Sequence, residues 1–240
     1  GVSCAGRAGV ATSKADAKPV DVAVDHLLIA TPDLELGRDY AEALFGTRPV
    51  VGGSHPGQGT RNALLGLEND AYIEIIAPDP AQPADLPLSR FLAAQAKPAF
   101  AWWCARCDQL ERLRETLLAS GKDAGAVEPW SRQAPDGATL SWRLLMPKDP
   151  VLGAALPFFI SWDDMNRHPS RHLPVVGRLS RLSVAHPRAA ALTALPTWVA
   201  TTTAPAAAVE AKIAVEQDSV TLAMPDELLP TIAAVIASEA

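Results

Sequence analysis

Two residues suited to chemistry stand in stretches of this chain that are otherwise mostly apolar. His26 is the lone histidine of a run at residues 22–31, and Glu74 is the lone glutamate of a run at residues 71–77. If both runs are strands and pair, an imidazole and a carboxylate face the same side of one sheet. Zinc, nickel, manganese and ferrous iron all accept such nitrogen and oxygen donors, so the pair predicts half of a divalent metal site.

A catalytic metal normally takes three protein ligands, so a third donor has to come from another part of the chain. His55 opens the string His-Pro-Gly-x-Gly-Thr-x-Asn at residues 55–62, and His168 also stands beside a proline. Both lie in loops long enough to fold over a cleft. Either imidazole is predicted to supply the third metal donor or to act as the catalytic acid or base near neutral pH. The alternatives are a tight surface turn at 55–62 and a surface position for His168.

Three further residues are predicted to contact a substrate. Asn62 opens an apolar strand, where its carboxamide needs a polar partner, and we expect it to face the cavity. Trp162 could wall an apolar ligand or could fill the core. Arg181 stands in a late stretch, residues 181–187, at the position that His26 holds in the matching stretch at 26–32.

The elements that must position these residues repeat along the chain. A strand at 22–31, a helix that Asp33 caps and Gly46 ends, and three more strands form a first unit. A weaker copy and a third start follow, and every such unit has a sheet face that it cannot bury alone, so the units must pair. The remaining predicted elements are strands at 49–53, 60–67 and 71–77, a strand at 100–106, a helix at 108–120, strands at 126–130, 139–146 and 156–162, and a hairpin around 216–218.

The order strand, helix and three strands, with His26 in the first strand and Glu74 in the last, resembles the βαβββ module of the vicinal oxygen chelate superfamily. The strings at 55–62 and at 158–170 resemble its glyoxalase-like branch. The resemblance implies an α+β fold of paired βαβββ modules that form curved mixed sheets around a cleft, with His26 and Glu74 as metal ligands. The implied layout is a flexible tail at 1–20, a glyoxalase-like domain at 21–175 with modules at about 22–80 and 98–165, and a partial third βα module at 176–240.

The second unit departs from the family pattern at the positions where the other metal ligands belong. Those positions are Ala101 or Trp102, and residues 158–160, and none of them can bind a metal. Two functions therefore stay open. The first is a divalent-metal-dependent isomerase, lyase or dioxygenase that acts on a small oxygen-bearing substrate. The second is a non-catalytic protein of the same fold that binds or sequesters a small molecule.

The composition of the chain limits the classes of molecule that it can bind. A formal net charge of -6, with no run of Lys or Arg, argues against nucleic acid and anionic membranes as partners. No stretch reaches the roughly 18 apolar residues that a membrane span needs. Cys104 and Cys107 are predicted as core residues without a metal or disulfide role.

We expect a cytoplasmic protein, and the sequence leaves its oligomeric state open, a homodimer included. Val2-Ser3-Cys4 would end a lipoprotein signal if an apolar segment preceded it, and the chain would then be exported or lipid-anchored.

Overall fold

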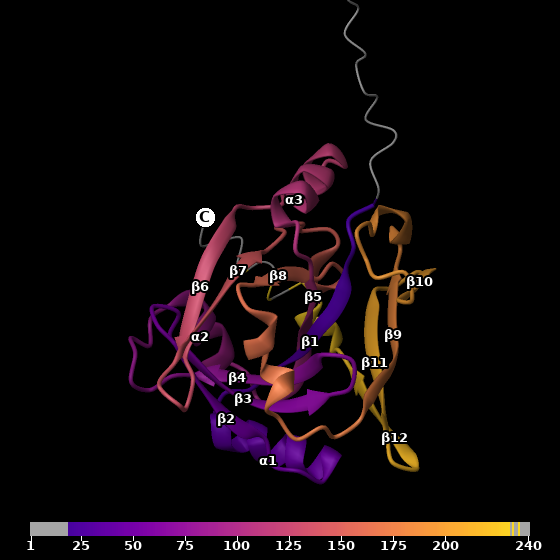
Figure 1. The fold of residues 1–240 in the computed structure, drawn as a ribbon. Helices are drawn as coiled ribbons and strands as arrows, with labels where there is room; N and C mark the ends of the chain where they lie inside the picture. The colour runs from indigo at the N-terminus through magenta and orange to yellow at the C-terminus, as the bar shows by residue number, and fades with distance from the viewer. Residues whose placement is uncertain (1–18, 231, 233–234, 236–240) are drawn as a thin grey trace, which may run out of the picture.

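The computed structural model describes residues 19–230, 232 and 235. Cys4 and most of the predicted tail therefore lie outside the described residues. Within them, the structure confirms the predicted α+β fold of paired βαβββ modules (Figure 1).

The first module follows the predicted order closely. The Asp33 carboxylate accepts a hydrogen bond from the Leu36 backbone N–H at 3.0 Å and so caps the helix. Gly46 ends the helix in the left-handed region, with φ of 73°, where a residue with a side chain would be strained. The elements are β1 (Ala23–Ala30), α1 (Leu34–Phe45), β2 (Val50–His55), β3 (Thr60–Leu67) and β4 (Ala71–Pro78).

The second module repeats this order after a short connecting helix that packs on β4 and begins with Pro87 in its first turn. Leu110, Leu113 and Leu117 form the buried side of its longer helix, at the helical spacing that the sequence shows. The elements are α2 (Pro87–Ala93), β5 (Ala99–Arg106), α3 (Leu110–Ala119), β6 (Val127–Gln133), β7 (Thr139–Leu145) and β8 (Phe158–Trp162).

Both modules contribute to one eight-stranded sheet with the order β2-β3-β4-β1-β5-β8-β7-β6. The first strand of each module pairs in parallel with the last, and the antiparallel β1–β5 ladder joins the modules. The sheet curls until its two edge strands, β2 and β6, lie against each other. Gly53 permits this contact, because a Cβ atom at this position would lie 2.4 Å from the Gln133 carbonyl oxygen.

The rest of the chain adds a second sheet along one side of the first (Figure 1). Its order is β10-β9-β11-β12, and the predicted hairpin around 216–218 joins the last two strands. This order differs from that of the modules, because β9 is parallel to the next strand, β10. The strands are β9 (Arg178–His186), β10 (Ala200–Thr203), β11 (Ala208–Val215) and β12 (Asp218–Ala223).

Short 3-10 turns connect several of these elements, and the two turns after β8 matter for the site described below. They are η3 (Met165–Arg167) and η4 (Pro169–Arg171), and His168 lies between them. The other turns are η2 (Gly153–Ala155), η5 (Ala189–Ala191) and η6 (Asp226–Leu228).

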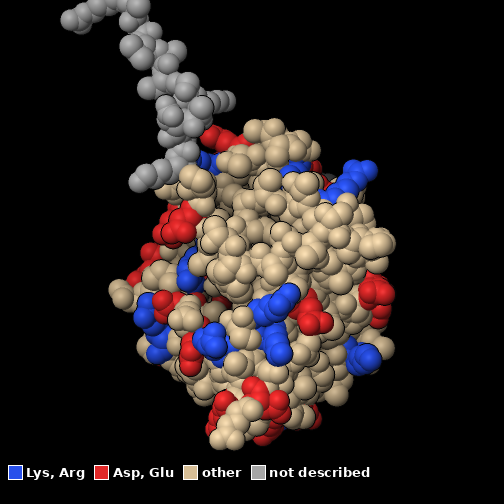
Figure 2. Space-filling view, turned by 90° about the vertical axis from the view of Figure 1, so that its right-hand side faces the viewer, with Lys and Arg blue, Asp and Glu red and all other residues tan. Residues whose placement is uncertain are grey.

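The surface shows no segregation of charge on the face drawn in Figure 2, where acidic and basic side chains are interspersed among uncharged ones. Among the described helices, none has the length and apolarity needed to span a membrane.

Candidate functional site

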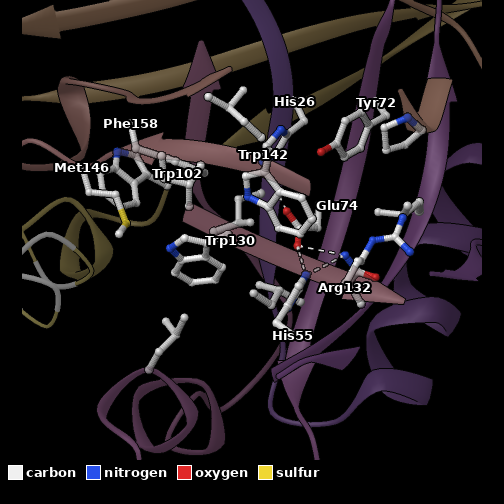
Figure 3. A pocket seen from close by; sticks show the side chains of 18 of the residues that line it. His26, His55, Tyr72, Glu74, Trp102, Trp130, Arg132, Trp142, Met146 and Phe158 are labelled. Atoms are coloured by element: carbon white, nitrogen blue, oxygen red, sulfur yellow. Dashed lines mark hydrogen bonds and ion pairs between the residues drawn. The ribbon is translucent and has the colours of Figure 1, made fainter. Parts of the chain in front are cut away.

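A pocket of about 720 Å³, its open mouth included, lies inside the curl of the eight-stranded sheet. The second module supplies an aromatic wall, whereas the first supplies most of the polar groups (Figure 3). The wall comprises Trp102, Trp130, Trp142, Phe158 and Trp162. The polar lining residues are His26, His55, Asn62, Tyr72, Glu74 and Arg132.

His26 and Glu74 meet in this pocket, from the parallel neighbours β1 and β4. The His26 Nε2 atom lies 3.2 Å from the Glu74 Oε2 atom, and both side chains are buried. The His26 ring also stacks on Tyr72, with the ring centroids 4.6 Å apart. The structure thus brings the two predicted metal ligands to one site with the geometry of an ion pair.

Burial works against the charge on His26, but its contacts with Cys104, Asp25 and Glu74 outweigh burial and raise its pKa well above the usual 6.5. Burial also raises the pKa of the Cys104 thiol to about 12, so this thiol is neutral at pH 7 and the two carboxylates stabilise the imidazolium. The pKa of Glu74 shifts in the opposite direction from that of His26. Burial raises it, but the contacts with His26 and Asn62 outweigh burial and lower it to about 2.

The amide of Asn62 connects Glu74 to His55. Its Nδ2 atom lies 3.2 Å from Glu74 Oε1 and 3.3 Å from His55 Nε2, while its Oδ1 atom accepts the Gly53 N–H at 3.1 Å. His55 Nδ1 lies 2.8 Å from Thr60 Oγ1, and burial lowers the pKa of His55. His55 is therefore a neutral imidazole whose two nitrogens are both engaged.

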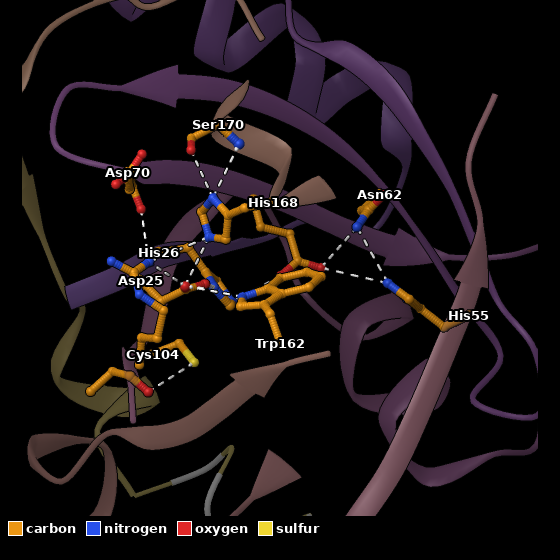
Figure 4. Close-up of polar contacts among 12 residues, drawn as sticks. Asp25, His26, His55, Asn62, Asp70, Cys104, Trp162, His168 and Ser170 are labelled. Carbon is orange, nitrogen blue, oxygen red and sulfur yellow. Dashed lines mark hydrogen bonds and ion pairs between the residues drawn. The ribbon is translucent and has the colours of Figure 1, made fainter. Parts of the chain in front are cut away.

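Asp25 holds His26 from the other side (Figure 4). Its Oδ1 atom lies 2.7 Å from His26 Nδ1, and its Oδ2 atom accepts hydrogen bonds from Arg106 at 2.8 Å, Trp162 at 3.1 Å and His168 at 2.9 Å. Burial opposes the charge of Asp25, yet the bonds from His168 and His26 outweigh it and lower its pKa. A break in the β1–β5 register between Val24 and His26 falls at Asp25, which lets neighbouring side chains of one strand meet.

Of the other five predicted site residues, three line the pocket and two do not. His55, Asn62 and Trp162 line the pocket. His168 is fully buried and reaches His26 indirectly, through its hydrogen bond to Asp25 and its ring contact with Tyr72. Arg181 is exposed on β9, where its Nε atom donates to Ser183 Oγ at 2.9 Å, and it does not line this pocket.

Sequence reasoning missed four polar residues of the site: Asp25, Tyr72, Arg106 and Arg132. Asp25 offered a signal, because it is a second ionisable residue in the apolar run of His26. Its role depends on the irregular register, which the sequence pattern does not reveal.

One cluster has donor atoms spaced closely enough for a metal ion. Donors of Asp25, His26 and Cys104 lie within 4.8 Å of one another. Asp25, however, already accepts four hydrogen bonds, one of them from the Arg106 cation. Because Arg106 already balances the charge of the Asp25 carboxylate, a metal ion at this cluster is disfavoured.

The other side of His26 suits a metal better, but it offers few donors. The 3.2 Å between His26 Nε2 and Glu74 Oε2 is a separation that two ligands of one ion can have. On β5 and β8, however, Trp102 and Phe158 line the pocket. Besides this pair, the described residues place His55 Nε2 on this side, 3.9 Å from Glu74 Oε1, where it already receives an N–H of Asn62. A resident catalytic ion normally takes three protein ligands, so His55 would have to give up that bond to complete the set.

A curled sheet that joins two βαβββ modules around a buried pocket is the fold of the vicinal oxygen chelate superfamily. The model of the glyoxalase-like domain family matches residues 24–201, more than half of the sequence, and the chain belongs to this family.

Solved structures similar to this chain are distant from it in sequence. A hypothetical protein from Staphylococcus aureus is 14% identical, with a TM-score of 0.58, and the match covers 85% of this chain and 88% of that chain. Methylmalonyl-CoA epimerase from Mycobacterium tuberculosis is 22% identical, with a TM-score of 0.39, over 58% of this chain and 85% of that chain. No curated protein sequence matches this chain significantly.

Proposed function

We propose that this chain binds a small, mostly apolar molecule with a carbonyl oxygen in the aromatic pocket and moves a proton on it through His26 and Glu74. The observation that supports this proposal is the buried ion pair between these residues, at 3.2 Å, in the lining of an otherwise largely apolar pocket. Titratable pairs with opposed pKa shifts inside pockets are typical of acid and base catalysis.

The expected chemistry is proton transfer at a carbon next to the carbonyl. Glu74 accepts the proton from this carbon, the C–H electron pair forms the carbon–carbon double bond of an enol, and the carbonyl oxygen takes the proton of His26 Nε2. When the His26 N–H turns from Glu74 to the substrate oxygen, Glu74 loses a bond that lowers its pKa. Burial then makes this carboxylate a stronger base.

Asp25 supports the proposed acid without contacting the substrate. It orients the His26 ring through Nδ1 and so directs Nε2 towards Glu74. A zinc, nickel, manganese or iron ion on His26 and Glu74 would instead polarise the substrate oxygen as a Lewis acid.

A second candidate is binding without catalysis. It is favoured by Trp102 and Phe158, which line the pocket from β5 and β8, where a second pair of polar ligands would complete a metal site. Such a wall can hold an apolar molecule by stacking alone.

Hydrogen exchange distinguishes the candidates. In deuterated buffer we expect the protein to accelerate exchange of the methylene protons of phenylpyruvate or related 2-oxo acids, followed by NMR. Glu74→Gln should remove this acceleration, whereas Glu68→Gln, an exposed glutamate paired only loosely with Arg178, should retain it. Saturable binding without any exchange would support the binding protein.

Metal dependence is tested by elemental analysis of protein purified without added metal. Stoichiometric metal that is lost in His26→Ala would support a metalloenzyme. Exchange that continues in metal-free protein would assign the chemistry to the side chains.

A further inference from the structure

Arg132 on β6 is a buried cation in the pocket, and only 5% of its surface is exposed. Its Nη1 atom donates to the Gly52 carbonyl oxygen at 3.0 Å. No carboxylate of the described residues forms an ion pair with it, in contrast to Arg106, which lies 2.8 Å from Asp25. A buried guanidinium without an anionic partner is costly, and a ligand can supply that partner.

The described site residues carry one more positive charge than negative charges, and that charge is on Arg132. Among the described residues, the Asp25 carboxylate contacts Arg106 and the Glu74 carboxylate contacts His26. Both anions are thus matched by other cations. Arg132 acts on Glu74 and Tyr72 only through space, without a hydrogen bond to either within the described chain. One negative charge on a bound ligand would balance the pocket.

A second donor lies in the same pocket. Tyr72 is 4% exposed, and its hydroxyl makes no hydrogen bond with any described residue. Buried hydroxyls normally have a partner, so this one is available to a ligand oxygen. Tyr72 on β4 and Arg132 on β6 line the same pocket.

The closure of the sheet fixes the position of Arg132. Its hydrogen bond to Gly52 joins the two edge strands, and a Cβ atom on Gly53 would lie 3.5 Å from Arg132 Nη1. The guanidinium is therefore held in place before a ligand arrives. Its remaining N–H groups can form the paired hydrogen bonds that a planar carboxylate accepts.

We propose that Arg132, with the Tyr72 hydroxyl, binds a singly charged oxyanion such as a carboxylate on the ligand, so that the pocket selects apolar molecules with an acid group. This inference rests on the proposed role of the pocket as a ligand site, but not on proton transfer. Figure 3 shows Arg132, Glu74 and His55 at one end of the pocket and Trp102, Phe158 and Met146 at the other. The acid group would therefore bind at the polar end, and the apolar body would lie along the aromatic wall.

Two dyes with similar aromatic bodies test this proposal. Anilinonaphthalene sulfonate carries one negative charge, whereas phenylnaphthylamine carries none, and both fluoresce on binding. In Arg132→Gln we expect the dissociation constant of the sulfonate to rise roughly ten- to a hundredfold, and that of the neutral dye to stay within about twofold. Arg181→Gln removes an exposed arginine of another strand and should change neither constant.

Arg132→Lys covers the case in which Arg132→Gln does not fold, which near-UV circular dichroism will show. Lysine keeps the charge but lacks the planar group, so the sulfonate should bind a fewfold more weakly while the neutral dye is unaffected. Equal effects on both dyes, no effect on either, or no saturable binding of the sulfonate by the parent would overturn the inference. Retained selectivity for the sulfonate without proton exchange would overturn the proposed chemistry alone.

Discussion

His168 donates a hydrogen bond of 2.9 Å to Asp25 Oδ2, and the other oxygen of this carboxylate holds His26 at 2.7 Å. The segment between the two 3-10 turns after β8 is thereby linked to β1, so that a turn of the second module positions a histidine of the first. His168 Nδ1 accepts the Ser170 N–H at 3.3 Å, which leaves the proton on Nε2 for Asp25. His168 is accordingly a positioning residue, and its effects should appear at His26.

Asp25→Asn should lower both stability and the pKa of His26. The substitution leaves the Arg106 cation without its carboxylate, and breaking a buried ion pair in this way costs about 3–5 kcal/mol. Urea unfolding measures the stability, and NMR titration of the imidazole measures the pKa. Asp108→Asn, at an exposed position before α3, is the matched control. An unchanged His26 pKa would contradict the role given to Asp25.

His168→Ala should raise the pKa of His26 further, because Asp25 then loses a donor and its carboxylate becomes a stronger acceptor for the His26 imidazolium. We expect a loss of about 1–3 kcal/mol in the free energy of unfolding from the fully buried site. His168→Gln retains an N–H donor and should bring the pKa of His26 part of the way back to that of the parent. If both variants lose the same stability and leave the His26 pKa unaltered, His168 serves packing alone.

Gly53→Ala should disturb the closure of the sheet. The new Cβ atom would lie 2.4 Å from the Gln133 carbonyl oxygen, which belongs to backbone and cannot turn away. We expect a loss of about 1–3 kcal/mol, as for other overpacked sites, together with weaker binding of anionic dye because Arg132 moves with β6. Val51→Ala, at an exposed residue of the same strand, should leave dye binding unchanged. Normal dye binding in Gly53→Ala would mean that the closure of the sheet does not determine the position of Arg132.

The sequence predicted the local elements well because their signals are local. Mostly apolar runs, the Asp33 cap and the Gly46 stop place the strands and the helix of the first module without reference to the rest of the chain. His26 and Glu74 were predictable as a pair because each is a lone ionisable residue of its type in an apolar run, and adjacent buried strands bring such residues together.

The remaining site residues depend on contacts between distant parts of the chain. Arg132 enters the pocket only because β2 and β6 meet, and no local pattern encodes that contact. Asp25 depends on an irregular strand register. Arg181 shows that a repeated pattern can also mislead. Its stretch matches that of His26 in sequence, but it lies in a different sheet.

The ion pair between Glu74 and His26 should give stability a defined dependence on pH. The pKa of Glu74 is lowered from 4.5 to about 2, so its contribution is complete above pH 4.5 and is lost as the pH falls towards 2. The pKa of His26 is raised, so its contribution is complete below pH 6.5 and is lost as the pH rises through the raised value. The stability difference between the parent and Glu74→Gln should therefore be greatest between about pH 4.5 and 6.5, on the order of 3 kcal/mol at most.

Urea unfolding of both proteins at a series of pH values measures this difference. The charge of Glu74 also acts on His55 by raising its pKa, which burial lowers, so the titration of His55 differs between the two proteins and contributes to the change at acidic pH. Glu68→Gln should follow the parent at every pH, because its side chain is exposed and only loosely paired. A gap between parent and Glu74→Gln that stays constant from pH 2 to neutrality would mean that Glu74 stabilises the fold by packing and by its bond to Asn62, and that its charge contributes nothing.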